Sequence, residues 1–457
     1  MASEWRNWAG DQRCTPAAIE WPASRGDLVD SVGQAADAGH RIRAAASGHS
    51  FTDIACTDGT MLRLERLNRV LDLDRSSGLV RVEAGITIHA LAEALHTYGL
   101  AMENQGDIDR QTLAGAISTG THGTGTRFRN LSAQVTSAEL VLADGSVVEV
   151  SADTDPEGLL AARVGLGALG ILYSVTLRAV PAFTIRRVDR PAPLGETLDE
   201  LDELADAHDH FEFYAFPHSE IAVLRESERT DRPPRPRSAA TDFLNEVVVE
   251  NWIPSAFARA SRAFPDLTPS LARFIAGRIG RSVKVDRSYR VYASERRIQF
   301  TEMEYGIPRE HAAEAVRRVF ELIEAEGLRV SFPIEVRFVA PDDSYLSPSH
   351  DRPTCYIAVH MFRGVEWEPY FRGVEAIMTS YGGRPHWGKR HFQIAETLAA
   401  RYPLWDEFQR VRARLDPEGA FANAYTNRVL GLVGQRNVLP SPRKVGTSST
   451  IRPPSTR

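Results

Sequence analysis

The chain is poor in cysteine and lysine, and it contains no long apolar run. Its 457 residues include only three cysteines, Cys14, Cys56 and Cys355. Three cysteines cannot build a disulfide framework, and their spacing fits no zinc site, so we expect no metal centre. The N-terminus lacks the apolar core of a signal peptide, and no apolar run reaches the length of a membrane span. The sequence therefore predicts a cytoplasmic protein without a membrane span.

The scarcity of lysine makes each lysine informative. Of the 54 lysines and arginines, only Lys284, Lys389 and Lys444 are lysines. Because arginine fills nearly every other cationic position, Lys389 is a candidate for a specific role. The formal net charge of −6 excludes a general affinity for nucleic acid.

The length and the mixture of short strands and helices predict an α+β protein with two domains. We expect the first domain to span residues 1–181 and the second to span residues 182–385. Residues 386–432 are expected to return to the first domain. The end of the chain, residues 433–457, becomes rich in Pro, Ser, Thr and Arg and is expected to be disordered.

Periodicity predicts the elements of both domains. In the first, we expect a strand, a helix and a strand over 16–43, a strand over 79–84, a helix over 88–98, a hairpin over 138–150 with a two-residue turn at Asp144-Gly145, a helix over 159–164 and a strand over 171–180. In the second, we expect strands over 211–217, 299–305, 333–339 and 355–362, and a helix over 308–327 with Pro308 in its first turn. This pattern indicates an antiparallel sheet with helices on one face.

Two loops of small residues contain a histidine each. His49 lies in the segment ASGHSF at 46–51, and His122 lies in GTHGTG at 120–125. Small residues let backbone N–H groups approach a diphosphate closely. A third glycine-rich segment, GLGALG at 165–170, matches the dinucleotide fingerprint, but a helix precedes it and a strand follows it. Since that order is the reverse of a nicotinamide site, we exclude a Rossmann fold.

Taken together, these segments resemble the sugar-1,4-lactone oxidases of the vanillyl-alcohol-oxidase type. The resemblance runs from about residue 5 to residue 431 and includes SGHSFTDIACTDG at 47–59, VEAG at 82–85, NQG at 104–106, PIEVRF at 333–338, GGRPHWGK at 382–389 and LDP at 415–417. It implies a two-domain PCMH-type FAD-binding fold of the α+β class, with an antiparallel-sheet cap domain that binds substrate. The implied reaction is oxidation of the C2 hydroxyl of a sugar lactone.

The resemblance also implies the residues that hold FAD, with a covalent bond through His49 as the expected attachment. The expected contacts are Ala46, Ser47, Gly48, His49, Ser50, Phe51, Gly106, Asp107, Thr112, Gly115, Ser118, Thr119, Gly120, His122, Ile171 and His386. For His122 and His386 a purely structural role stays open.

Four residues are candidates for the chemistry: Glu335, Arg337, Lys389 and His360. Glu335 and Arg337 lie two apart in a predicted strand, so their side chains share one face. A carboxylate and a guanidinium there can grip a polyol and stabilise a developing alkoxide. The spacing alone fits a surface ion pair as well, and it is the family resemblance that favours a catalytic role. Lys389 would add a compact cation.

Alternatives remain for the substrate and for the electron acceptor. His360 matches a substrate-site histidine of alditol oxidases, which act on linear polyols. Asp107, in contrast, stands at a position where alditol oxidases have a serine. A flavin-binding protein without turnover is a further alternative. For the acceptor, O2 and a cytochrome or dye are both open. The family associates a glycine at the position of Gly106 with oxidases, because one methyl group can close a path for O2.

Overall fold

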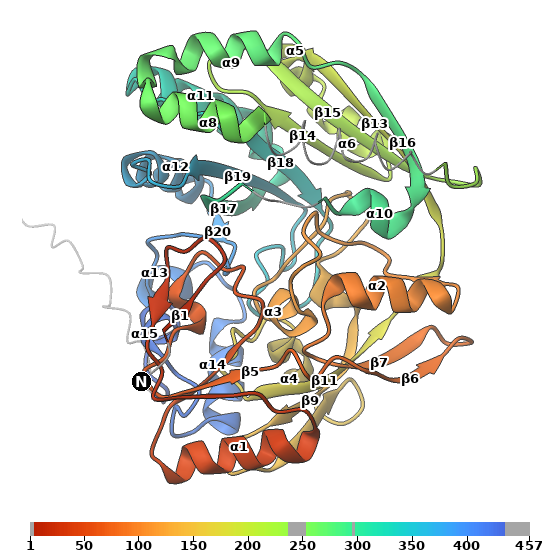
Figure 1. Cartoon of the computed structure of the whole chain (residues 1–457), viewed down its shortest axis with the longest axis vertical. Coiled ribbons are helices and arrows are strands. Elements are labelled where there is room, and N and C mark those ends of the chain that lie inside the picture. Colours follow the sequence, from red (N-terminus) through yellow and green to blue (C-terminus); the bar gives the residue numbers. More distant parts are fainter. Residues whose placement is uncertain (1–3, 236–252, 295–297, 435–457) are drawn as a thin grey trace, which may run out of the picture.

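The computed structural model describes residues 4–235, 253–294 and 298–434, which form two stacked lobes (Figure 1). The lower lobe in Figure 1 contains both the beginning and the end of the described chain, and the upper lobe contains the middle. Almost all of the tail that we expected to be disordered lies outside the described residues. No described helix is both long and apolar enough to cross a bilayer.

The lower lobe contains two main sheets. In its described part, a parallel sheet has the order β3-β5-β4, and an antiparallel sheet has the order β10-β9-β11-β7-β6. Their strands are β3 (Ala18–Glu20), β4 (Ile42–Ala45), β5 (Thr60–Arg63), β6 (Val70–Asp74), β7 (Leu79–Glu83), β9 (Val135–Val141), β10 (Val147–Ser151) and β11 (Ile171–Arg178). Two short pairs join β1 (Trp5–Arg6) to β2 (Arg13–Cys14), and β8 (Leu100–Ala101) to β12 (Val180–Pro181).

The helices of the lower lobe begin where the sequence provides capping side chains. Ser24, Thr87 and Asp155 accept hydrogen bonds from backbone N–H groups at the starts of three helices. The helices are α1 (Arg25–Asp37), α2 (Ile88–Thr97), α3 (Leu113–Ser118), α4 (Pro156–Ala162), α13 (Ala395–Ala399), α14 (Trp405–Leu415) and α15 (Ala424–Leu430). The predicted strand, helix and strand over 16–43 are confirmed, as are the strand at 79–84 and the helix at 88–98.

Three predicted details are wrong. The hairpin turn has three residues between Leu142 and Ser146, because only Gly145 takes a positive φ and a two-residue turn of the predicted kind needs two such residues. Helix α4 starts at Pro156 and ends at Ala162, earlier than expected, because Asp155 caps it. Pro308 ends a strand, and a 3-10 turn separates it from the following helix.

The upper lobe is built on one antiparallel sheet. Eight strands of the described chain follow the order β16-β13-β15-β14-β18-β19-β17-β20. They are β13 (Thr184–Pro193), β14 (His210–Ala215), β15 (Ile221–Thr230), β16 (Ser282–Arg287), β17 (Phe300–Pro308), β18 (Ile334–Val339), β19 (Thr354–Phe362) and β20 (Arg384–Pro385). The helices are α5 (Leu194–Asp199), α6 (Leu201–Ala207), α8 (Ile253–Ala263), α9 (Thr268–Ala276), α10 (Ser288–Tyr292), α11 (Ala312–Ala325) and α12 (Glu368–Ser380).

Strand alternation gives the two faces of this sheet different chemistry. One face is apolar, with Phe213, Val336 and Met303 among its buried side chains, and it packs with α5, α6, α11 and α12 in a single core. The intervening residues, such as Glu212, Glu335 and Glu302, point to the opposite face. That polar face is turned toward the lower lobe.

The core of the lower lobe takes residues from both ends of the chain. Side chains between Leu28 and Ala179 share one apolar cluster with Trp387, Phe408, Phe421 and other residues up to Leu430. The backbone also joins the two parts, because the N–H of Ile42 in β4 donates to the carbonyl of Ala420 over 2.8 Å.

Candidate functional site

Two cavities meet at Gln111, which lines both of them. A narrow one runs through the lower lobe between the loop at 46–50, the start of α3 and the glycine-rich segment before β11. A wider one, of about 750 Å³, lies between the lobes against the polar face of the large sheet. An elongated ligand can therefore extend from the lower lobe into the space below the cap.

The walls of the narrow cavity are short side chains and backbone. The backbone N–H groups of Ser47, Gly48, His49 and Ser50 find no acceptor within the described part of the chain. Gly48 has a φ of +70°, and a side chain at Gly115 would lie 3.1 Å from the Cβ of Ala46. Such a lining, with free N–H donors and no side chain filling the space, suits the diphosphate of a dinucleotide.

The predicted FAD contacts divide into three groups. Ala46, Ser47, Gly48, His49, Ser50, Thr112, Gly115, Ser118 and Thr119 line the narrow cavity. Gly106, Asp107, His122 and His386 line the wide one. Phe51, Gly120 and Ile171 line neither cavity. The ring of Phe51 packs on Phe300, with 5.6 Å between the ring centroids, and Ile171 points into the apolar core between two wall residues.

His49 is a neutral side chain at the wall of the narrow cavity. Its ring lies against Trp8, with 5.7 Å between centroids. Burial, and secondarily the charge of Lys389, lowers the pKa of His49 to about 4. At neutral pH the imidazole therefore keeps a lone pair that can act as a nucleophile.

The structure brings all four predicted catalytic residues together on the wall of the wide cavity. Glu335 and Arg337 point into it from β18, His360 from β19, and Lys389 from the segment after β20. All four are buried or nearly so. The surface ion pair that the spacing of Glu335 and Arg337 also allowed is wrong, since the two residues are only 8% and 7% exposed.

Arg337 is held by three carboxylates. Its Nε donates to Glu212 over 2.8 Å, and its Nη2 forms ion pairs with Glu335 and, over 3.3 Å, with Asp107. Nη2 nevertheless makes no hydrogen bond of good geometry within the described chain. Asp107, Glu335 and Glu212 outweigh the burial that lowers the pKa of Arg337, so that pKa is raised and the guanidinium stays charged.

Glu335 and its neighbour Glu212 differ in electrostatic environment. Burial raises the pKa of Glu335, Asp107 and Glu212 add to this effect, and Arg337 only partly opposes it. For Glu212, burial acts in the same direction, but Arg337 and Arg225 prevail and lower its pKa. The hydroxyl of Tyr214 donates to Glu335 over 3.2 Å. Of the two carboxylates, Glu335 therefore takes up a proton more readily.

Lys389 belongs to a second ionic cluster, on β17. Its Nζ pairs with Glu302, and the Nε2 of His360 lies 3.5 Å from the same carboxylate. Burial lowers the pKa of Lys389, but Glu302 and Glu304 outweigh it, so the pKa is raised. The wide cavity thus has two fixed cations, each oriented by buried carboxylates.

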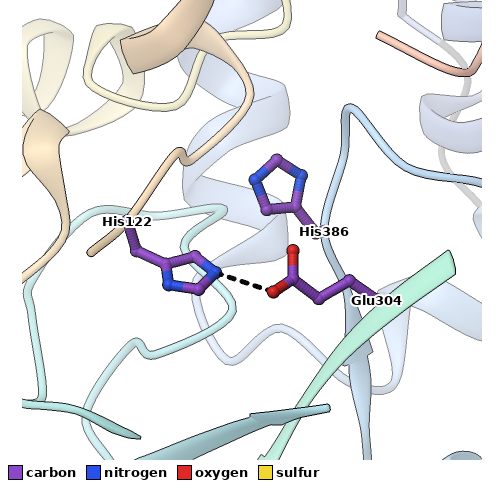
Figure 2. A group of neighbouring side chains, drawn as sticks. All are labelled: His122, Glu304 and His386. Carbon is purple, nitrogen blue, oxygen red and sulfur yellow. Dashed lines mark ion pairs between the residues drawn. The ribbon is translucent and has the colours of Figure 1, made fainter. Parts of the chain in front are cut away.

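His122, Glu304 and His386 converge on one another from three separate segments (Figure 2). The Nε2 of His122 lies 3.2 Å from Glu304, and its Nδ1 faces the carbonyl of Gly123. The Nδ1 of His386 accepts a hydrogen bond from the N–H of Gly388, and burial lowers the pKa of His386 to about 3. The neutral His386 then carries its proton on Nε2, which leaves no lone pair for a metal. The geometry favours a hydrogen-bonded cluster over a metal centre.

The sequence analysis missed four residues that shape this site: Glu212, Tyr214, Glu302 and Glu304. All four show the alternation that identified Glu335 and Arg337. Glu302 and Glu304 flank the buried Met303, and Glu212 and Tyr214 flank the buried Phe213. The polar face of β14 and β17 could therefore have been predicted from the sequence.

Comparisons with known proteins found two matching family models and relatives of similar length. A family model described as D-arabinono-1,4-lactone oxidase matches residues 175–429, and one described as FAD binding domain matches residues 16–151. The L-gulono-1,4-lactone dehydrogenase of Mycobacterium tuberculosis is 51% identical, over 94% of this chain and 100% of that relative. The L-gulonolactone oxidase of Mus musculus is 34% identical, over 93% and 98%.

Among solved structures, a solvent-stable cholesterol oxidase superposes with a TM-score of 0.78. The match covers 94% of this chain and 97% of that one, at 19% identity. At this identity the likeness concerns the fold alone, and it confirms the predicted fold class.

Proposed function

Because the chain belongs to the D-arabinono-1,4-lactone oxidase family of FAD-dependent oxidoreductases, we propose that it oxidises the C2 hydroxyl of a sugar-1,4-lactone similar to L-gulono-1,4-lactone. Bound FAD would accept the hydride of the carbinol carbon at its N5 atom. The observation that carries this proposal is the pair of buried cations, Arg337 and Lys389, on the cavity that continues from the narrow one. Because the members of this family are enzymes, we reject the alternative that the protein binds a flavin without turnover.

Arg337 and Lys389 would supply the positive charge that the substrate oxygen requires. As the hydride leaves, the hydroxyl oxygen gains negative charge unless its proton departs. Fixed donors that are already oriented stabilise such charge without reorganisation. The carboxylates around the two cations hold them in place, and Nη2 of Arg337 has an N–H that is not used in a well-formed hydrogen bond.

Glu335 is the residue we propose to orient the hydroxyl and accept its hydrogen bond. Its raised pKa makes it a better proton acceptor than an ordinary carboxylate. His360 contributes by fixing Glu302, the partner of Lys389. Its presence is also the feature that keeps a linear polyol, oxidised at a terminal hydroxyl, as the alternative substrate.

We further propose that the residues of the narrow cavity hold FAD and that His49 bonds to it covalently. The free N–H donors at 47–50 support the first part. The low pKa of His49 supports the second, since a neutral imidazole is the nucleophilic form.

For the electron acceptor we propose O2, on the basis of Gly106 at the cavity wall. A cytoplasmic location is proposed from the same sequence features as before.

Anaerobic titration of the flavin absorbance tests the function. We expect L-gulono-1,4-lactone, added in excess over the enzyme, to bleach the oxidised flavin. We expect xylitol to bleach it far more slowly. Fast bleaching by xylitol with none by the lactone would replace the proposal with the alditol alternative. Identification of the keto product at C2 distinguishes this reaction from oxidation at a terminal hydroxyl.

A further inference from the structure

One end of the cap carries a cluster of exposed apolar side chains. Phe264, Leu267 and Phe274 are 64%, 52% and 55% exposed, and all lie within the hairpin formed by α8, the turn Pro265–Leu267 and α9. The described chain has six other large apolar side chains that are exposed. Val283 lies in the upper lobe, and the other five are scattered over the lower lobe. Solvated apolar residues gathered in one hairpin indicate an interaction surface.

The hairpin presents these side chains on one face. Helix α9 buries Thr268, Ala272 and Ala276 against the cap. Leu267 and Phe274 are seven residues apart, which places them two turns apart along the opposite, solvated face. Figure 1 shows α8 and α9 at the top of the cap, far from α1 at the base of the molecule.

The same segment is strongly basic, although the chain as a whole is acidic. Between residues 253 and 283 it contains one acidic residue, Asp266, and five exposed arginines: Arg259, Arg262, Arg273, Arg278 and Arg281. No ion pair with a carboxylate of the described chain involves any of these arginines. The guanidinium of Arg278 lies 3.4 Å above the ring of Phe274, so charge and apolar surface are directly adjacent.

We propose that this hairpin docks the enzyme on an anionic phospholipid surface. Phenylalanine and leucine side chains on a protruding turn insert at the boundary between headgroups and acyl chains, and surrounding arginines bind lipid phosphates. The positive charge of the hairpin complements an anionic headgroup layer and opposes docking on a neutral one. Phe274, Arg278 and Arg281 also line the wide cavity. Docking therefore turns the rim of that cavity toward the membrane.

Vesicle flotation of the full-length holoenzyme tests this proposal. We expect binding to phosphatidylcholine vesicles that contain phosphatidylglycerol, at least about tenfold weaker binding to phosphatidylcholine alone, and loss of binding at high salt. The double variant Phe264→Ser/Leu267→Ser should weaken binding by about tenfold or more. Arg259→Gln/Arg273→Gln should weaken it by roughly 30-fold, about fivefold for each arginine.

The matched control is Leu71→Ser/Tyr98→Ser, which removes exposed apolar side chains from the lower lobe. It should bind vesicles like the unmodified enzyme. None of the substituted residues lines either cavity, so flavin content and melting temperature report whether each variant is folded. Failure of the unmodified enzyme to bind anionic vesicles overturns the proposal, as does equal loss in the control. A dimer in light scattering that Phe264→Ser/Leu267→Ser dissociates, without vesicle binding, assigns the face to a second copy instead.

Discussion

Among single residues, Arg337 has the most direct predicted effect on catalysis. Removing one preorganised donor typically lowers turnover by about 10²–10³. We expect Arg337→Lys, which keeps the charge but loses the planar fork, to slow anaerobic flavin reduction within that range while FAD occupancy stays near normal. Lysine is preferable to alanine, because alanine would remove the cation that pairs with the buried Glu335 and Glu212. Near-normal reduction in the folded variant would mean that a positive charge at this position is sufficient and that the planar guanidinium is not required.

The raised pKa of Glu335 predicts a pH dependence of the reductive step. A raised pKa means that the carboxyl group stays protonated to a higher pH than an ordinary glutamate. If the ionised form accepts the substrate proton, the rate of flavin reduction falls as the pH falls through that raised value. Stopped-flow reduction between pH 4 and 8 should show this acid limb.

Substitution separates Glu335 from its neighbour Glu212. Glu335→Gln should slow reduction and abolish the acid limb. The carboxylate of Glu212 has a lowered pKa. Glu212→Gln should therefore retain the acid limb, even if it lowers the rate of flavin reduction at every pH. An unchanged limb in Glu335→Gln would assign the titration to another group.

His49 provides a test of covalent attachment. After acid precipitation, the unmodified enzyme should keep its yellow colour in the pellet, and His49→Ala should release it into the supernatant. The low pKa that burial gives His49 is the reason to expect a nucleophilic imidazole. Complete release of flavin from the unmodified enzyme would refute the covalent bond and leave FAD binding itself intact.

Gly106 is the residue that we expect to govern reaction with O2. A Cβ there would lie 3.1 Å from the carbonyl oxygen of His122 and 3.4 Å from Cγ2 of Thr121, so a methyl group would fill the space beside the cavity. Gly106→Ala should slow reoxidation in air-saturated buffer and leave anaerobic reduction unchanged. Gly33→Ala, in α1 with no atom within 4 Å of the new Cβ, is the control. Reduced flavin that persists for minutes in the unmodified enzyme would make it a dehydrogenase.

At the scale of elements, the start of α15 fixes the loop that follows His49. Asn423 caps α15 through its Oδ1, and its Nδ2 donates to the carbonyls of Asp53, Ile54 and Cys56 over 2.9–3.2 Å. Without Asn423, the carbonyl of Ile54 keeps the guanidinium of Arg43 and that of Asp53 keeps the N–H of Cys56. The carbonyl of Cys56 is left without a donor in the described chain, at a cost of about 1–3 kcal/mol. Asn423→Ala should therefore lower the melting temperature and, in a His49→Ala background where no covalent bond retains the flavin, speed FAD release on dilution.

Asn423→Asp is the matched variant, because it keeps an acceptor for the cap and loses the donors. In the same His49→Ala background it should release FAD about as fast as Asn423→Ala while it retains more of the thermal stability. Release at the rate of His49→Ala alone in both double variants would show that the loop holds its conformation without α15.

Elements also show how far sequence reasoning reaches. Alternation placed Glu335 and Arg337 on one polar face, because the side-chain period of a strand is a local property. Which residues lie opposite them is not local. Glu212 stands across from Arg337 although 124 residues separate them in the chain. For the same reason, loop residues such as Phe51 could be assigned to the FAD site by resemblance but not oriented.

For the whole molecule, composition and periodicity predicted the fold class and the antiparallel sheet of the cap, and the family resemblance supplied the expected FAD contacts. Sequence alone does not predict that the two cavities join at Gln111, nor that Arg337 and Lys389 are each paired with buried carboxylates. Both facts depend on how the lobes meet. The electrostatic state of Arg337 and Lys389 is therefore a property of the assembled molecule rather than of either residue.

The shared core of the lower lobe has a consequence for how the protein is made. A ribosome releases Leu28 and its neighbours long before Trp387 and Phe408, yet all of them belong to one apolar cluster. The sheet and helices of the upper lobe have their own core and are complete earlier in synthesis. The first segment to emerge is thus the last to reach its final structure. Until then the apolar side chains of this segment that pack on the last helices lack their final partners.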